Sequence, residues 1–207
     1  MAMNAAKKTM RPEVWVWLAR ERMGGLHPAL PEVLQEGAAL ARRLGCALVA
    51  LGDRAPDDAE RAVLGRWGVA QVRVLGAPLP LHPALKPGAL PLAPLLTGAP
   101  PRVLLLLADA FGRAVAPLLA AELGALCLTG LAGLAAASPG ADGSAQQGAP
   151  LVAVRPTLGG QFETLAPLPM DTPVVATLEP GAVGAPSEPP RIPGHNGVAP
   201  ALVVVGV

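Results

Sequence analysis

Up to residue 130 the chain alternates short apolar runs with amphipathic segments. The apolar runs, typical of strands buried on both faces, occupy residues 13–19, 46–51, 69–75, 102–108 and 125–129. Apolar residues at helical spacing lie between several of them, at residues 31–44, 57–67 and 113–123. Such alternation requires a mostly parallel sheet with helices on both faces. The pattern therefore predicts a three-layer αβα, Rossmann-like fold.

After residue 130 the helical spacing disappears. Shorter strands joined by turns are predicted at residues 131–137, 151–155, 162–168 and 174–178. A loop rich in Gly, Ser and Gln, residues 138–148, separates the first two, and residues 76–101 are rich in Pro and Gly with at most a short helix at 90–96. We therefore expect a β-rich C-terminal part added to the parallel sheet.

Both ends of the chain differ from the middle in composition and in apolar pattern. Residues 1–12 lack an apolar pattern and are expected to be disordered, which places the domain at residues 13–186. Six prolines between residues 180 and 200 predict a linker, and residues 187–207 are interpreted as this linker followed by a strand-like tail at 201–207. The tail is either a strand without its sheet or a strand that pairs with another edge.

Composition narrows the functional classes. Apolar residues make up 52% and charged residues 15%, against about 25% charged in an average globular chain. Either compositional bias explains this, or apolar surface is buried against a partner. The net charge of +1, without tyrosine and with two phenylalanines, argues against nucleic-acid binding.

Membrane insertion and metal binding are not expected either. The longest charge-free stretch, residues 123–141, contains several glycines and a proline and is interpreted as two short strands rather than a span. Cys46 and Cys127 are isolated in strand-like runs, which is typical of buried thiols in a cytoplasmic protein.

Three motifs follow one another in the second half of the chain. Residues 112–124 read Gly-Arg-Ala-Val-Ala-Pro-Leu-Leu-Ala-Ala-Glu-Leu-Gly, residues 155–161 read Arg-Pro-Thr-Leu-Gly-Gly-Gln, and residues 172–181 read Thr-Pro-Val-Val-Ala-Thr-Leu-Glu-Pro-Gly. The series resembles the N-terminal domain of the electron transfer flavoprotein alpha subunit over about residues 13–186. In that family the motifs read roughly Gly-Arg-Asp-Leu-Ala-Pro-Arg-Leu-Ala-Ala, Arg-Pro-x-Tyr-Gly-Gly-Asn and Arg-Pro-x-Met-Ala-Thr-x-Arg-Pro-Gly.

The resemblance implies a fold and a function. The fold is the adenine nucleotide hydrolase-like form of the Rossmann architecture. The family forms a heterodimer of alpha and beta subunits that carries electrons from flavin dehydrogenases, with FAD held mainly by a second alpha-subunit domain and AMP often held by the beta subunit. No counterpart of that second domain follows residue 181, so we expect this chain alone to bind no cofactor and to act with a beta-type subunit as its partner.

The chain departs from the family pattern at several charged positions. Thr129-Gly130 stands where the family has Thr-Asp, Thr172 replaces an arginine, and Glu179 replaces the arginine before Pro-Gly. Leu158 and Gln161 replace an aromatic residue and an asparagine. These changes indicate a diverged member that has lost some polar contacts.

The turn after the clearest central strand holds the first candidate site. Asp109, Gly112 and Arg113 open the predicted helix, and a helix N-terminus at the carboxyl end of a strand offers free N–H groups to an anion. These three residues are the candidate cofactor-binding residues. The alternative is purely structural, with Asp109 capping the helix, Gly112 serving the turn and Arg113 in a surface ion pair.

A second candidate site concerns a partner. Arg155, Leu158, Gly159 and Gly160 are predicted to lie at the subunit interface, since the resembled segment lies near the subunit contact. A plain hairpin turn is the alternative, because paired glycines also suit positive φ angles.

Catalytic groups are not apparent in the sequence. The three histidines are isolated in predicted loops, and neither a Gly-x-Ser-x-Gly motif nor a phosphate-binding glycine loop occurs. We therefore expect an electron-transfer scaffold component rather than an enzyme. The alternatives are a stand-alone adenine-nucleotide-binding module and a truncated remnant without an electron-transfer role.

Overall fold

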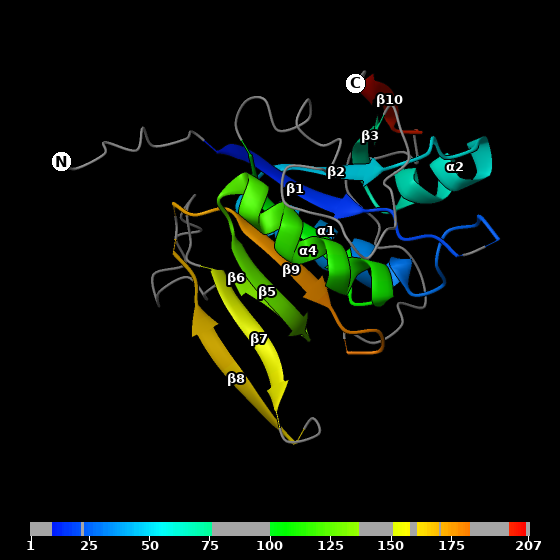
Figure 1. Ribbon diagram of the computed structural model, residues 1–207. Helices are drawn as coiled ribbons and strands as arrows, with labels where there is room; N and C mark the ends of the chain where they lie inside the picture. Colours follow the sequence, from blue (N-terminus) through cyan, green and yellow to red (C-terminus); the bar gives the residue numbers. More distant parts are fainter. Residues whose placement is uncertain are drawn as a thin grey trace.

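The computed structural model describes residues 10–21, 23–75, 100–136, 151–157, 161–169, 171–182 and 199–205. They form a seven-stranded, wholly parallel sheet and a three-stranded antiparallel sheet (Figure 1). The strands of the main sheet, in their order across it, are β10 (Ala201–Val205), β3 (Val69–Leu75), β2 (Ala47–Gly52), β1 (Arg11–Trp17), β4 (Pro101–Leu107), β9 (Val174–Leu178) and β5 (Leu126–Leu131). The small sheet contains β6 (Gly133–Ala136), β7 (Leu151–Thr157) and β8 (Phe162–Pro167).

Helices cover both faces of the main sheet, which confirms the predicted α/β class. Side chains of α1 (Leu30–Leu44) and α2 (Asp58–Arg66) pack in one apolar cluster with Val14 and Val16 of β1. Side chains of α4 (Ala110–Leu123) pack in a second cluster with Trp15 and Trp17, on the other face of the same strand. Alternate residues of β1 therefore serve two separate cores, as the uninterrupted apolar run requires.

The position of β9 differs from the sequence-based expectation. Residues 174–178 were predicted to belong to the β-rich C-terminal part, but β9 lies inside the main sheet between β4 and β5 and is parallel to both. All five of its residues are buried. A run that is apolar on both faces loses most of its contact with water only in a central position. Its one polar residue, Thr177, accepts a hydrogen bond from the Gly130 N–H at 3.0 Å.

The C-terminal strand joins an edge of the same sheet. The sequence left open whether residues 201–207 form a strand without a sheet, and β10 pairs in parallel with β3. Arg61 of α2 donates to the carbonyl oxygen of Pro200 at 3.2 Å, just before β10 begins. The predicted short helix at 90–96, the loop at 138–148 and all but the last two residues of the predicted linker at 187–200 lie outside the described residues.

The small sheet is fastened to α1 through carboxylates. The expected single strand at 131–137 is interrupted at Ala132, where the chain passes from β5 into β6. Glu36 accepts a hydrogen bond at 2.6 Å from the N–H of Leu134, on the edge of β6 that faces α1. One turn earlier in α1, Glu32 accepts a hydrogen bond at 2.7 Å from the N–H of Gly181. Two neighbouring carboxylates of α1 thus hold β6 and the turn after β9.

Glu36 makes the stability of this junction depend on pH. Burial raises the pKa of Glu36, and the hydrogen bond from Leu134 and the charge of Arg43 offset this only in part. A pKa that is higher in the folded than in the unfolded state means that the stability contribution is fully present below the unfolded pKa and is lost as pH rises through the folded pKa. The ionised carboxylate is therefore the costly form at neutral pH.

We expect Glu36→Gln to gain stability relative to the wild type as pH rises from 5 to 7. The amide oxygen still accepts the Leu134 N–H bond but carries no charge to desolvate. Urea unfolding at both pH values measures this, with Glu163→Gln, an exposed carboxylate of β8, as the matched control. A Glu36→Gln variant that loses stability relative to the wild type over that range would contradict the assignment.

Candidate functional site

A cleft of about 410 Å³ opens at the carboxyl ends of β1, β2 and β4. Ligands bind at this edge of parallel sheets where successive connections leave toward opposite faces, as α1 and α4 do on either side of β1 and β4. The lining residues come from the three turns after these strands: Trp17, Leu18, Ala19, Arg20, Glu21, Gly24, Asp53, Arg54, Asp109 and Phe111. This is the candidate site to which the fold itself points.

Two aromatic rings form part of its wall. Trp17 and Phe111 stack with ring centroids 5.3 Å apart and an angle of 25° between the planes. Trp17 is 3% exposed and belongs to the core on the α4 side, whereas Phe111 is half-buried. The stack therefore fixes the start of α4 against β1, and Phe111 presents the more accessible ring to the cleft.

The loop after β1 is held by two arginines. Arg20 donates to both carboxylate oxygens of Glu60, at 2.8 and 3.0 Å, and to the carbonyl oxygen of Gly24 at 2.9 Å. Arg54 donates to the same Gly24 carbonyl. Glu60 is fixed in turn because it forms a capping box with Asp57 at the start of α2. Both cations of the cleft are thus engaged by groups of the protein itself.

The predicted turn after β4 has a well-defined structure. Asp109 is the N-cap of α4, and its Oδ1 accepts a hydrogen bond from the Gly112 N–H at 2.6 Å. A Cβ atom on Gly112 would lie 1.9 Å from the carbonyl oxygen of Leu107. Gly112 therefore permits the close approach of α4 to the end of β4.

Arg113 lies at the surface beside this turn. It donates to the Ala108 carbonyl oxygen at 2.8 Å and to both carboxylate oxygens of Glu179 at 2.9 and 3.1 Å. The structure thus brings Asp109, Gly112 and Arg113 together in the capping, turn and ion-pair roles that the sequence offered as the alternative. Their contact with a cofactor stays a prediction.

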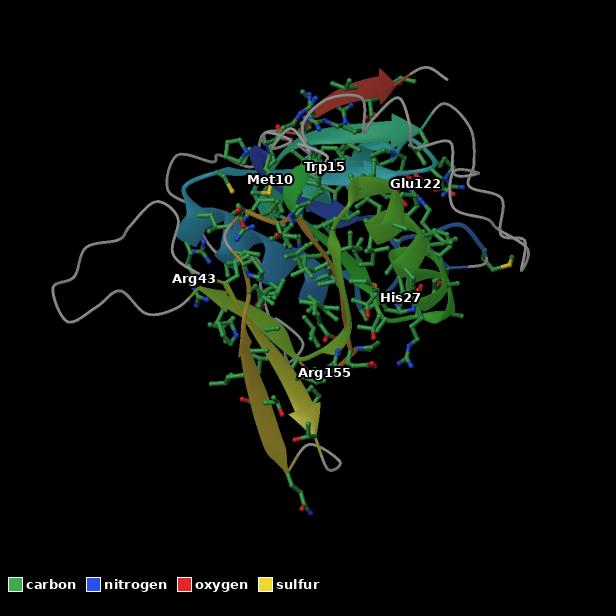
Figure 2. All side chains as sticks on the ribbon, turned by 60° about the vertical axis from the view of Figure 1, so that its left-hand side comes forward. Met10, Trp15, His27, Arg43, Glu122 and Arg155 are labelled. Carbon is green, nitrogen blue, oxygen red and sulfur yellow. The ribbon has the colours of Figure 1, made fainter. Side chains whose placement is uncertain are left out.

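Arg155, the first of the predicted interface residues, lies in the second half of β7, in a hairpin that stands out from the body (Figure 2). Its guanidinium donates to the Thr129 carbonyl oxygen of β5 at 3.0 Å. Leu158, Gly159 and Gly160, predicted for the same interface, lie outside the described residues.

The small sheet turns an apolar face to the solvent. Residues directly opposite in antiparallel strands share a face, and Val154 pairs with Leu165 while Val152 pairs with Pro167. We call the set on this side the outer face; its members are Gly133, Ala135, Val152, Val154, Pro156, Glu163, Leu165 and Pro167, of which Glu163 alone is charged. None of them is buried, and Leu165 is 64% exposed.

The opposite face of the small sheet packs on the core. Leu134, Leu151 and Ala153 are buried in the same cluster as α1. An antiparallel sheet with one buried face normally carries polar residues on the other, so an apolar outer face is a sign of a binding surface. Sequence reasoning did not place an apolar surface on this strand, although residues 151–154 are all apolar. Since successive side chains of a strand point to opposite faces, such a run indicates that both faces are apolar.

The part of the chain that the structure describes contains no buried cysteine: Cys46 is half-buried and Cys127 is exposed, which corrects the expectation of buried thiols. Within that part, no group of three or more His, Cys, Asp or Glu side chains is placed to hold a metal ion. Among the described helices, none combines the length and the apolar character that a bilayer span requires.

Comparison with known proteins decides the family. Residues 14–201 match the model of the electron transfer flavoprotein domain. The chain belongs to the electron transfer flavoprotein domain family. The match does not separate alpha from beta subunits, and a search of curated proteins finds no significant match. Members of this family are generally electron carriers rather than enzymes, in complexes that typically contain FAD.

The family match extends beyond the domain boundary expected from the sequence. It continues past residue 186 and reaches the first residue of β10. The strand that completes one edge of the main sheet thus begins where the matched region ends. The boundary at residue 186 and the linker after it stay predictions.

Two departures from the electron transfer flavoprotein pattern meet in space. Gly130 stands where the family has an aspartate, and Glu179 where it has an arginine. Gly130 has a φ of +67°, and a Cβ atom there would lie 3.0 Å from Oε1 of Glu179. The Glu179 carboxylate therefore occupies the space beside residue 130 and pairs with Arg113. In the sequence, the absence of an acid at Gly130 and the presence of one at Glu179 were the signal that these two positions are neighbours.

We expect Gly112→Ala to destabilise the fold by at least about 2 kcal/mol, because the new methyl group overlaps a backbone oxygen that cannot rotate away. Helix propensity alone would favour alanine by about 1 kcal/mol. The sign of the change in stability therefore distinguishes steric overlap, which destabilises, from helix propensity, which stabilises. The matched control is Gly25→Ala, where a Cβ meets no atom within 4 Å. Chemical unfolding measures both variants. Equal stability of the two would show that α4 moves freely relative to β4.

Proposed function

We propose that this chain is an electron transfer flavoprotein alpha-subunit-like protein that forms the scaffold half of a heterodimer with a beta-type subunit. The assembly would carry electrons from a flavin dehydrogenase in the cytoplasm. Three alpha-type motifs in order support the choice of subunit, and two cysteines without a disulfide fit a reducing compartment. The observation that carries the proposal is the apolar outer face of the small sheet.

The outer face suits a permanent partner. Apart from Glu163 its side chains are apolar or proline, and the hairpin projects from the body so that a second protein can reach it (Figure 1). Obligate interfaces bury about 2,000 Å² or more and are more hydrophobic than the average surface. A sheet of the beta-type subunit packed on this face would provide such an area, with the two sets of side chains interdigitating. Leu158, Gly159 and Gly160 follow β7 directly and would extend the contact.

Arg155 has a supporting place in this proposal. Its bond to the Thr129 carbonyl links β7 to the edge strand of the main sheet. A hairpin tied to the body in this way presents the outer face with less loss of conformational freedom on binding, which favours affinity. Arg155 therefore positions the interface and is itself exposed to the partner.

The described cleft is small for FAD. A site for a ligand of that size must bury most of its surface, and binding cavities range from about 300 to 1,000 Å³. The cleft of about 410 Å³ lies near the lower end of that range. In this proposal the flavin is therefore held outside the described cleft.

Two other functions remain as alternatives. A stand-alone adenine-nucleotide-binding module is favoured by the position of the cleft at the carboxyl ends of the strands, although the turns at Gly24 and Asp109 that line it are poor substitutes for a phosphate-binding glycine loop. A remnant without an electron-transfer role would have no beta-type partner. The following experiments separate these alternatives.

Leu165→Asp is expected to weaken binding to the beta-type subunit at least about a hundredfold, because a carboxylate on the outer face would lose its water in the complex. Thr164→Asp is the matched control, since Thr164 is also exposed but points to the opposite side of β8. Titration calorimetry with a beta-type subunit measures both. Unchanged affinity in Leu165→Asp would remove the outer face from the interface.

Absorbance between about 350 and 500 nm tests where the flavin resides. The chain purified alone is expected to be colourless, because no described cavity buries a ligand as large as FAD. Reconstitution with FAD, followed by gel filtration, extends the measurement to added cofactor. Stoichiometric flavin on the isolated chain would contradict the scaffold role.

A further inference from the structure

The cleft lies where a fold of this family would hold the phosphate of a nucleotide. The carboxyl edge of a parallel sheet beside a helix N-terminus is the usual position, because backbone N–H groups and the helix dipole attract an anion there. Whether a phosphate can bind depends on the charged groups that line the cleft. Three of them are carboxylates, Glu21, Asp53 and Asp109, and two are guanidinium groups, Arg20 and Arg54.

Both guanidinium groups of the cleft hold the loop after β1, but only one of them is neutralised. Arg20 is 12% exposed and is neutralised by two hydrogen bonds to Glu60. Arg54 donates to the Gly24 carbonyl and lies against that glycine, since a Cβ on Gly24 would be 3.1 Å from its Nη1. A carbonyl oxygen does not neutralise a guanidinium group, so Arg54 keeps its positive charge, and the three carboxylates of the cleft outnumber it.

The helix N-terminus already has an anion of its own. The Gly112 N–H of α4 points to the Asp109 carboxylate at 2.6 Å, so a phosphate approaching the helix would meet a negative charge instead of a free donor. Asp53 adds a second carboxylate at the end of β2, and it makes no hydrogen bond or ion pair with any other residue in the described ranges. Two like charges within a few ångströms of a phosphate repel it strongly in a partly buried site.

We infer that this cleft excludes phosphate, and that Asp53 and Asp109 are the residues that set this selectivity. The chain would then not bind AMP at the position where its family architecture provides a nucleotide site. The inference concerns the cleft alone and does not depend on the proposed heterodimer. It is also a direct test of the nucleotide-binding alternative.

The experiment compares AMP binding to the wild-type chain and to the double variant Asp53→Asn/Asp109→Asn. Asparagine is a good N-cap and its side-chain oxygen still accepts the Gly112 N–H bond, so the turn keeps its structure while both charges are removed. Isothermal titration measures affinity, and the amide resonances of Gly24 and Phe111 report whether the ligand lies in the cleft. Glu163→Gln is the control for the loss of a distant negative charge.

The wild type and Glu163→Gln are expected to show no saturation by AMP at about 1 mM, whereas the double variant binds at least about tenfold more tightly. This gain should shrink as salt is raised, since screening weakens the repulsion that was removed. Saturation of the wild-type cleft by AMP below 1 mM would overturn the inference. An AMP affinity that is the same in the double variant and the wild type would also overturn it, because the aspartates would then not determine selectivity.

Discussion

The burial of β9 is the constraint on which the rest of the structure depends. Its five residues are 1% exposed or less, so they need a strand on each side and cover on both faces. The chain must therefore return from the small sheet to the centre of the main sheet, between β4 and β5. That return makes residues 132–173 an excursion from the sheet. It also places Glu179, immediately after β9, beside Arg113 at the start of α4.

The excursion explains why the apolar outer face exists at all. The small sheet buries one face against α1, and Glu36 satisfies an N–H group on the edge of β6. On its other face, Val154 and Glu163 share a small pocket with Glu36 and Arg43 of α1, whereas Leu165 is 64% exposed. Covering exposed apolar side chains with a partner is favourable, so this face is available for association.

Sequence reasoning predicted the helices and strands better than it predicted which strands lie next to one another. The parallel strands and the three described helices follow from apolar spacing, and the cap at Asp109 follows from residue type. The position of β9 did not follow, because a short apolar run has the same appearance in either sheet and long-range pairing leaves no local pattern. The cleft was missed because its lining comes from three turns far apart in sequence. Leu158 was selected from the family pattern alone, whereas Leu165 needed the pairing of β7 with β8.

Charge at the carboxyl edge of the main sheet serves largely to hold the structure together. Glu179 stands where the resembled alpha-subunit pattern has an arginine, and it pairs with Arg113 beside Gly130. The ion pair thereby joins the start of α4 to the residue that follows β9. In the nearby cleft, by contrast, the arginines hold the loop after β1 and the carboxylates line the opening. Arg20 of this edge is neutralised by Glu60, and the three carboxylates of the cleft outnumber the charge of Arg54, so the electrostatics of the opening disfavour an anion.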